Sequence, residues 1–210
     1  MRLLFVRHGE STWNVEGRFQ GRQDPPLSPL GEMQARAVAE RLAREGHMRS
    51  IISSPQRRAR ATAQTIATRC KLEVVCDERL VEIAHGEWEG LLRAQVAQRW
   101  PDWLERWRDE PQSVQFPGGE SLSQVRTRFL SFIGDASGFG SPLIVCTHDV
   151  IIRLAVLWAC GEPVERFTGL KSDNAGVTEI DLTDGQPTLV RQNDVAHLGE
   201  LRSDLAGQAL

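Results

Sequence analysis

The sequence predicts an α/β protein, a three-layer α/β/α sandwich with a mainly parallel central sheet. Short apolar runs rich in β-branched residues alternate along the chain with longer segments of helical periodicity. The runs in "LLFVRHGE" and "PLIVCTHD" are apolar at every position, which is typical of strands buried on both faces. Each of these two runs stops at a histidine, so the same titratable residue ends two predicted strands.

Length and composition indicate one domain over residues 1–210. A chain of 210 residues that is 40% hydrophobic is long enough to bury a substantial single core. Its net charge of -3 gives no electrostatic footprint for nucleic acid or for an anionic membrane, so we expect neither as a partner.

Three features favour a cytoplasmic protein. The apolar run before Arg7 is too short for the core of a signal peptide. The longest apolar stretch, "VIIRLAVLWACG", is interrupted by Arg153 and falls well short of a membrane span. The four cysteines form no C-x-x-C pair, and we expect buried free thiols in a reducing compartment.

The first half of the chain predicts three strands and two helices. The first strand covers about Leu3 to Val6 and is followed by a polar, glycine-containing loop. Ser28 and Pro29 then provide an N-cap and a proline at the first helical position, so a helix follows to about Arg44. The next elements are a strand in "RSIISS", a helix in "PQRRARATAQTIATRC" and a short strand in "KLEVVCD".

The middle of the chain predicts a lid-like helical insertion at about 90–120. Helical periodicity runs through "LLRAQVAQRW", breaks at Pro101 and resumes in "DWLERWRDE". The loop "PQSVQFPGGES" follows, because its prolines and glycines exclude regular structure.

The last third returns to the alternation of helix and strand. Ser121 is the expected N-cap of a helix that ends near Phe132, and the strand "PLIVCT" comes next. A helix from about Val150 to Cys160 precedes two strands, "GVTEIDL" and "TLVRQN", joined by a turn at 184–185.

The candidate chemistry lies where the parallel strands end. Ligands of an open parallel sheet bind at the carboxyl ends of its strands, and His8 and His148 both lie at that edge. Arg7 precedes His8, and Arg57 and Arg58 open the helix that follows the second strand. Arginine side chains beside a helix N-terminus suit a dianion such as phosphate.

Cleavage of a phosphate ester also needs a proton donor for the leaving alkoxide. The segment "RLVEIAHGEWEG" supplies Glu82, Glu87 and Glu89. The residue type alone does not choose among these three carboxyl groups.

Four segments in order resemble the signature of the histidine phosphatase (phosphoglycerate mutase-like) superfamily: "LLFVRHGESTWN", "ISSPQRRARATA", "LVEIAHGEWEG" and "VCTHDVIIRL". The resemblance extends from Leu3 to about Leu198. It implies a single histidine phosphatase domain with the phosphoglycerate mutase-like fold.

The resemblance implies roles for particular residues. His8 matches the nucleophile that accepts the phosphoryl group on an imidazole nitrogen, and Glu82 matches the proton donor. A histidine nucleophile must be neutral, and we expect its other ring nitrogen to donate to a backbone carbonyl. The matching phosphate-binding residues are Arg7, Arg58 and His148, with Asn14 as a supporting donor.

Further candidates concern the substrate. Gln20 and Gly21 fall where the family contacts its substrate, and His85 is either a solvated loop residue or a substrate contact. Asp149 stands where the family usually has glycine, and its backbone amide is a candidate phosphate contact. Because a carboxylate repels a phosphate dianion, we expect its side chain to point away and to cap the following helix.

We expect no metal and no cofactor. The sequence has no H-x-H, H-E-x-x-H or clustered carboxylate pattern, and two arginines beside His8 would oppose a bound cation.

The resemblance leaves three classes of function. They are a phosphomonoesterase acting through a phosphohistidine on His8, a 2,3-bisphosphoglycerate-dependent phosphoglycerate mutase, and a non-catalytic phosphate-binding module. The segment from Glu82 to His148 lacks the long insertion of the mutases, which favours the phosphatase.

"EIAHGEWEG", "RWRDEPQSVQFPGGES" and "AHLGEL" are similar to the metal-independent phosphoserine phosphatases of this superfamily. The expected partner is therefore a small phosphorylated metabolite, with L-phosphoserine as the leading substrate. A broad-specificity or α-ribazole phosphate phosphatase is the nearest rival. Because members of the superfamily often form dimers, a second copy of the chain is a further candidate partner.

Overall fold

A six-stranded mixed sheet forms the centre of the molecule, in the order β3-β2-β4-β1-β5-β6. The computed structural model describes residues 1–205 and 207–209. Four neighbouring strands are parallel, β5 runs antiparallel to β1, and β6 runs antiparallel to β5. The strands are β1 (Arg2–Arg7), β2 (Ser50–Ser53), β3 (Val74–Cys76), β4 (Leu143–Thr147), β5 (Val177–Thr183) and β6 (Gln186–Asp194). The predicted mainly parallel sheet is confirmed.

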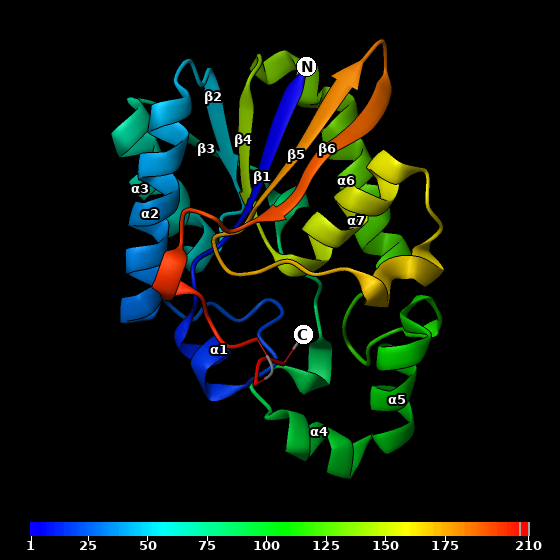
Figure 1. The fold of residues 1–210 in the computed structure, drawn as a ribbon. Helices are drawn as coiled ribbons and strands as arrows, with labels where there is room; N and C mark the ends of the chain where they lie inside the picture. Colours follow the sequence, from blue (N-terminus) through cyan, green and yellow to red (C-terminus); the bar gives the residue numbers. More distant parts are fainter. Residues whose placement is uncertain (206, 210) are drawn as a thin grey trace.

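Helices cover both faces of the sheet (Figure 1). Helices α2 (Pro29–Glu45) and α3 (Arg57–Cys70) pack on one face, and α6 (Leu122–Asp135) and α7 (Asp149–Cys160) pack on the other. Ser28 and Ser121 cap α2 and α6 through their side chains, as predicted.

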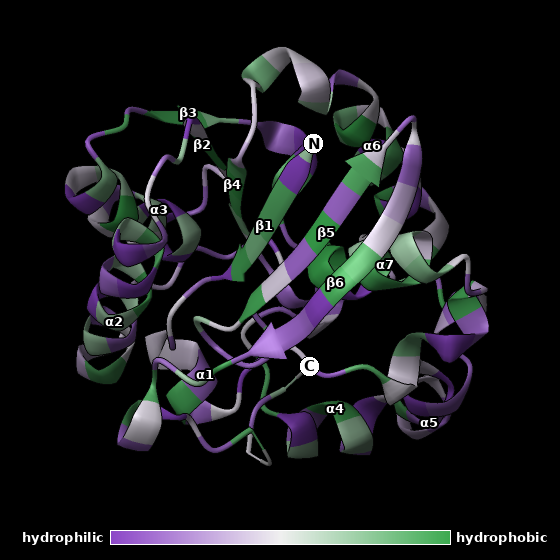
Figure 2. Cartoon of the chain, turned by 45° about the horizontal axis from the view of Figure 1, so that its top comes forward, coloured by the Kyte–Doolittle hydropathy of each residue, from purple (hydrophilic) through white to green (hydrophobic). Residues whose placement is uncertain are grey.

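The residues of β1 alternate between the two cores. Leu3 and Phe5 belong to the cluster beneath α6 and α7, whereas Leu4 and Val6 belong to the cluster beneath α2 and α3. All four side chains are fully buried, which explains the unbroken apolar run in the sequence. In Figure 2 this central strand is mostly hydrophobic, whereas the edge strand β6 is largely hydrophilic.

Two short helices stand apart from these layers. Helices α4 (Arg93–Arg99) and α5 (Pro101–Asp109) lie beyond the carboxyl ends of the parallel strands, together with α1 (Thr12–Glu16) and the C-terminal segment (Figure 1). Pro101 occupies the first position of α5, so the predicted break in the helix is confirmed.

Helix α1 (Thr12–Glu16) lies where the sequence predicted an irregular polar loop. Ser11 and Asn14 form a reciprocal capping box, and Gly17 ends the helix in a left-handed conformation with φ of 69°. The helix has only five residues and no apolar periodicity, so only the cap could have revealed it.

Short 3₁₀ helices connect the main elements: η1 (Glu78–Leu80), η2 (Gly86–Trp88), η3 (Pro111–Ser113), η4 (Ala136–Phe139), η5 (Val164–Gly169) and η6 (Gly199–Leu201).

The four cysteines are free. Cys146 is buried in β4 and Cys70 is half-buried, but Cys76 and Cys160 are exposed, so the prediction of buried thiols is wrong for these two. Each lies at the end of an element, where its side chain reaches the surface. Across residues 1–205 and 207–209, no helix has both the length and the apolar character needed to cross a membrane.

Candidate active site

A small cavity of about 20 Å³ lies at the carboxyl ends of β1 and β4. It brings together most of the predicted site residues, from segments far apart in the sequence. Its lining consists of Arg7, His8, Gln20, Gly21, Arg58, Glu82, His85, Asp149, Val150 and Ala209.

His8 follows β1 and is held by both its backbone and its side chain. Its amide donates to the carbonyl of Thr147 at 3.0 Å, and its Nδ1 lies 2.7 Å from the carbonyl oxygen of Gly9. Because a carbonyl only accepts, Nδ1 carries the hydrogen and Nε2 is left with its lone pair. Burial, and then the charges of Arg58 and Arg7, hold the pKa of His8 well below its ordinary value, so the ring is neutral.

His148 lies beside His8, with the two ring centroids 5.1 Å apart. Its Nε2 forms a 2.8 Å hydrogen bond with the hydroxyl of Ser54, which follows β2. Burial and the charge of Arg58 hold its pKa well below the ordinary value. The ends of β1, β2 and β4 therefore meet at one point, and the sequence had not indicated Ser54.

Arg7 and Arg58 are buried cations with incomplete hydrogen bonding. Arg7 donates to the carbonyl of Ser172 at 2.5 Å, and Arg58 donates to the carbonyls of Gln23 and Gly21 at 2.8 and 3.1 Å. In both side chains the buried Nε has no hydrogen-bond partner within the described chain. Burial lowers the pKa of Arg58 to about 10, which still leaves it charged at neutral pH. Spare donors on buried cations suit an oxyanion.

Glu82 is the carboxyl group of its segment that reaches the cavity. Glu87 is exposed, and Glu89 lies outside the cavity, where it accepts the amides of Arg22 and His85. The Glu82 amide donates to the side chain of Gln56 at 2.9 Å. Burial, then the negative charge of Asp149, raises the pKa of Glu82, and this outweighs the opposing effects of the Ile83 amide and the two arginines.

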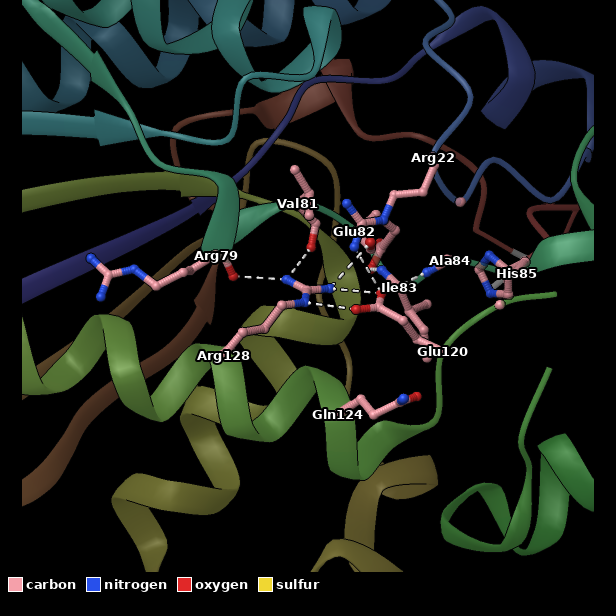
Figure 3. A network of polar contacts seen from close by, with 12 residues as sticks. Arg22, Arg79, Val81, Glu82, Ile83, Ala84, His85, Glu120, Gln124 and Arg128 are labelled. Atoms are coloured by element: carbon pink, nitrogen blue, oxygen red, sulfur yellow. Dashed lines mark hydrogen bonds and ion pairs between the residues drawn. The ribbon is translucent and has the colours of Figure 1, made fainter.

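Arg128 on α6 fastens the segment that carries Glu82 (Figure 3). Its guanidinium donates to the carbonyls of Arg79, Val81 and Glu82 at 2.7, 2.6 and 3.2 Å. It also pairs with Glu120, whose carboxylate accepts the Ala84 amide at 2.9 Å. The sequence had not indicated this network, because Arg128 lies 46 positions from Glu82.

His85 is buried, so the alternative that it is a solvated loop residue is wrong. Its ring packs against the rings of Phe19, Trp107 and Phe116, with centroids 5.3, 6.1 and 4.8 Å away. Within the described residues neither ring nitrogen has a hydrogen-bond partner. Burial, reinforced by Arg58, lowers the pKa of His85 to about 3.

The C-terminal segment reaches the cavity through Gln208 and Ala209. The side-chain oxygen of Gln208 accepts from Arg7 at 3.0 Å and from Asn14 at 3.1 Å, and its amide donates to Asn174 at 2.8 Å. Ala209 forms part of the wall. The remaining space of about 20 Å³ is close to that of one water molecule, so the cavity in this form is too small for a phosphate group.

Asn14 lies beside the cavity, whereas Gln20 belongs to its lining. Asn14 accepts the Ser11 amide at 3.0 Å, and the side-chain oxygen of Gln20 accepts the Ser11 hydroxyl at 2.8 Å. Asn14 therefore reaches the site through Gln208, whereas Gln20 and Gly21 line it directly.

The predicted capping role of Asp149 is wrong. His148 is the N-cap residue of α7, and Asp149 occupies the first helical position. Its carboxylate pairs with Arg153 one turn further along, at 2.9 Å, and also lines the cavity. From the first helical position the carboxylate lies one turn from Arg153, so it forms this ion pair instead of a cap hydrogen bond.

The family model described as the histidine phosphatase superfamily (branch 1) matches residues 3–195. The chain belongs to the histidine phosphatase superfamily. It is an enzyme of this superfamily, with phosphatases among its relatives.

Several similar proteins carry the name of a phosphatase. The chain is 37% identical over 202 residues to phosphoserine phosphatase 1 of Hydrogenobacter thermophilus, and the match covers 95% of each chain. A mycobacterial glucosyl-3-phosphoglycerate phosphatase superposes with a TM-score of 0.82 at 31% identity, over 91% of this chain and 98% of that one. An Entamoeba histolytica phosphoserine phosphatase mutant, solved with phosphoserine, superposes with a TM-score of 0.81 at 28% identity, over 94% and 98%. The phosphoglycerate mutase-like α/β fold is thereby confirmed.

In the described ranges, no group of three His, Cys, Asp or Glu side chains is arranged to hold a metal ion.

Replacing Arg128 tests the network around Glu82. Arg128→Ala leaves three carbonyls without this donor and removes the ion pair with Glu120, and we expect a loss of about 2–4 kcal/mol in the free energy of unfolding. Urea unfolding measures this loss. Arg126→Ala, at an exposed position on the same helix, is the matched control and should change stability by less than about 0.5 kcal/mol. Equal effects of the two variants would contradict the role of the network.

The buried His85 predicts a stability difference that depends on pH. Its pKa is about 3 in the folded protein and close to 6.5 when unfolded, so the unfolded state binds the proton first as the pH falls below 6.5. His85 therefore destabilises the fold by about 1.4 kcal/mol per pH unit below that point. We expect His85→Gln to gain about 2 kcal/mol relative to wild type between pH 7.5 and pH 5, measured by urea unfolding. A difference that is independent of pH would refute the burial of a neutral ring.

Proposed function

We propose that this histidine phosphatase hydrolyses a small phosphorylated amino acid, with L-phosphoserine as the preferred substrate. His8 is the phosphoryl acceptor, Glu82 the proton donor, and Arg7, Arg58 and His148 hold the phosphate oxygens. The reaction uses no metal.

In the first step Nε2 of His8 attacks phosphorus and the bond to the ester oxygen breaks. Glu82 gives its proton to that oxygen, so the leaving group departs as serine rather than as an alkoxide. The guanidinium groups of Arg7 and Arg58 stabilise the charge on the phosphoryl oxygens.

In the second step water attacks the phosphohistidine. Glu82, now ionised, takes the proton from that water, and the bond between phosphorus and Nε2 breaks. Phosphate leaves, and both His8 and Glu82 return to their starting protonation states.

The tautomer of His8 is the observation that carries the mechanism. Its Nδ1 is committed to the Gly9 carbonyl, so a neutral ring presents Nε2 as its nucleophilic atom. The buried neighbours of that ring are cations and an acid whose pKa is raised, which is the set of groups that a phosphoryl transfer to histidine needs.

The choice of phosphoserine has separate support. The relative from Hydrogenobacter thermophilus, a phosphoserine phosphatase, matches nearly the full length of the chain.

Replacing His8 tests the covalent step. We expect His8→Asn to lower kcat by at least about a thousandfold without unfolding the protein, because it removes the nucleophile. His47→Asn, at an exposed histidine, is the matched control and should keep wild-type activity. Rapid quench of wild type with ³²P-labelled substrate should trap an acid-labile, base-stable phosphoenzyme. The mechanism is wrong if no phosphoenzyme forms and His8→Asn remains active.

A panel of phosphomonoesters tests the substrate. We expect kcat/KM for L-phosphoserine to exceed that for α-ribazole 5′-phosphate and glucosyl-3-phosphoglycerate by at least about tenfold. A tenfold preference in the opposite direction would identify one of these rivals instead. Interconversion of 3- and 2-phosphoglycerate with added 2,3-bisphosphoglycerate, at a rate above that of ester hydrolysis, would identify a mutase.

A further inference from the structure

Asp149 is a buried anion at the wall of a phosphate-binding cavity. Its side chain is 5% exposed, and one carboxylate oxygen is paired with Arg153 at 2.9 Å. The other oxygen, Oδ1, is buried without a hydrogen-bond partner among the described residues. A buried carboxylate oxygen in this state is costly unless a donor reaches it when the site is filled.

The free-energy cost of burying the Asp149 carboxylate depends on which substrate fills the cavity. A phosphate dianion held by Arg7 and Arg58 lies in the same cavity, so the carboxylate repels it. A cationic group on the substrate, close to the phosphate, would remove that repulsion and supply the missing donor. A substrate without such a group would experience the repulsion alone.

A second hollow of about 150 Å³ adjoins the cavity at the same residue. Asp149 lines both spaces, whereas Arg93, Arg108 and Arg153 line only the second. Aromatic side chains of Trp107 and Phe167 complete its wall. A substrate that reaches past Asp149 therefore meets first an anion and then a group of arginines.

This arrangement of charges matches an amino acid phosphate. In phosphoserine the phosphate is joined through its ester oxygen and one CH2 group to Cα, and Cα carries both the ammonium group and the carboxylate. The protein places cations, then the carboxylate of Asp149, then cations again. Each charge of the substrate faces its opposite.

We propose that Asp149 is the specificity-determining residue of the site and binds the ammonium group of the substrate through Oδ1, while the arginines of the second hollow receive its carboxylate. This inference rests on the proposed function, which it deepens from phosphate hydrolysis to recognition of the leaving group.

Three esters distinguish the contribution of the ammonium group from that of the carboxylate. L-Phosphoserine carries both charged groups, phosphoethanolamine keeps only the ammonium, and 3-phosphonooxypropionate keeps only the carboxylate. Asp149→Asn should lower kcat/KM at least about 30-fold for the two ammonium esters, because a buried charge pair is lost. For 3-phosphonooxypropionate the loss should be at least about tenfold smaller, because the effect of Asp149 on the pKa of Glu82 is common to all three esters and only the ammonium esters also lose the charge pair.

A second Asp149 variant and a control variant extend the comparison of the three esters. Asp149→Ser removes the carboxylate and its pairing with Arg153 together, and it should show the same selective loss. Glu179→Gln is the matched control, because Glu179 is another buried carboxylate paired with an arginine and lies on β5 outside both hollows. It should change none of the three values by more than about threefold. An equal loss for all three esters in both Asp149 variants, or no loss in either, would overturn the inference.

Binding to an inactive protein separates this inference from the proposed function. Calorimetric titration of His8→Asn, with and without Asp149→Asn, compares L-phosphoserine with 3-phosphonooxypropionate in the absence of turnover. A preference for phosphoserine that disappears with Asp149→Asn supports the inference. If wild type does not hydrolyse phosphoserine, the proposed function fails on that assay alone. If Asp149→Asn does not change the binding preference, this inference fails whatever the wild type hydrolyses.

Discussion

The structure depends on keeping two arginines and two histidines buried together at one edge of the sheet. Desolvation and like charge both oppose this cluster, and the result is visible in the lowered pKa values of Arg7, His8, Arg58 and His148. The histidines respond by remaining neutral, and the arginines donate to backbone carbonyls. The surrounding fold supplies those carbonyls and keeps water out.

Parallel strand packing explains how residues so far apart in the chain reach one place. Adjacent strands β1 and β4 are in register from Leu3 with Leu143 to Arg7 with Thr147, so the histidines that follow them emerge side by side. The sequence was sufficient to predict that the two histidines lie side by side. A strand buried on both faces is recognised by an unbroken apolar run, and the first polar residues after the run mark where the strand ends. The fold and the meeting of Arg7, His8 and His148 could be predicted for that reason, whereas Gln20, Gly21, Glu82 and His85 were indicated by the motifs of the superfamily.

The remaining parts of the site depend on contacts that leave no local pattern. Gln208 reaches Arg7 across 201 positions and Arg128 reaches Glu82 across 46, and neither residue belongs to a motif. Asp149 was correctly predicted to lie beside the cavity, but its side chain was expected to cap α7 and instead pairs with Arg153. A carboxylate at this position suits both the free amides of the helix N-terminus and an arginine one turn later. Only the three-dimensional arrangement decides between such competing partners.

Burial has opposite effects on the acid and the base, and this separates their roles. A neutral imidazole and a protonated carboxyl group are both the uncharged forms, so the same dry environment lowers the pKa of His8 and raises that of Glu82. The negative charge of Asp149 raises the pKa of Glu82 further. Closure of the cavity by Gln208 and Ala209 therefore does more than block it: by excluding water, it favours the protonation states in which histidine can accept a phosphoryl group and the glutamate can donate a proton.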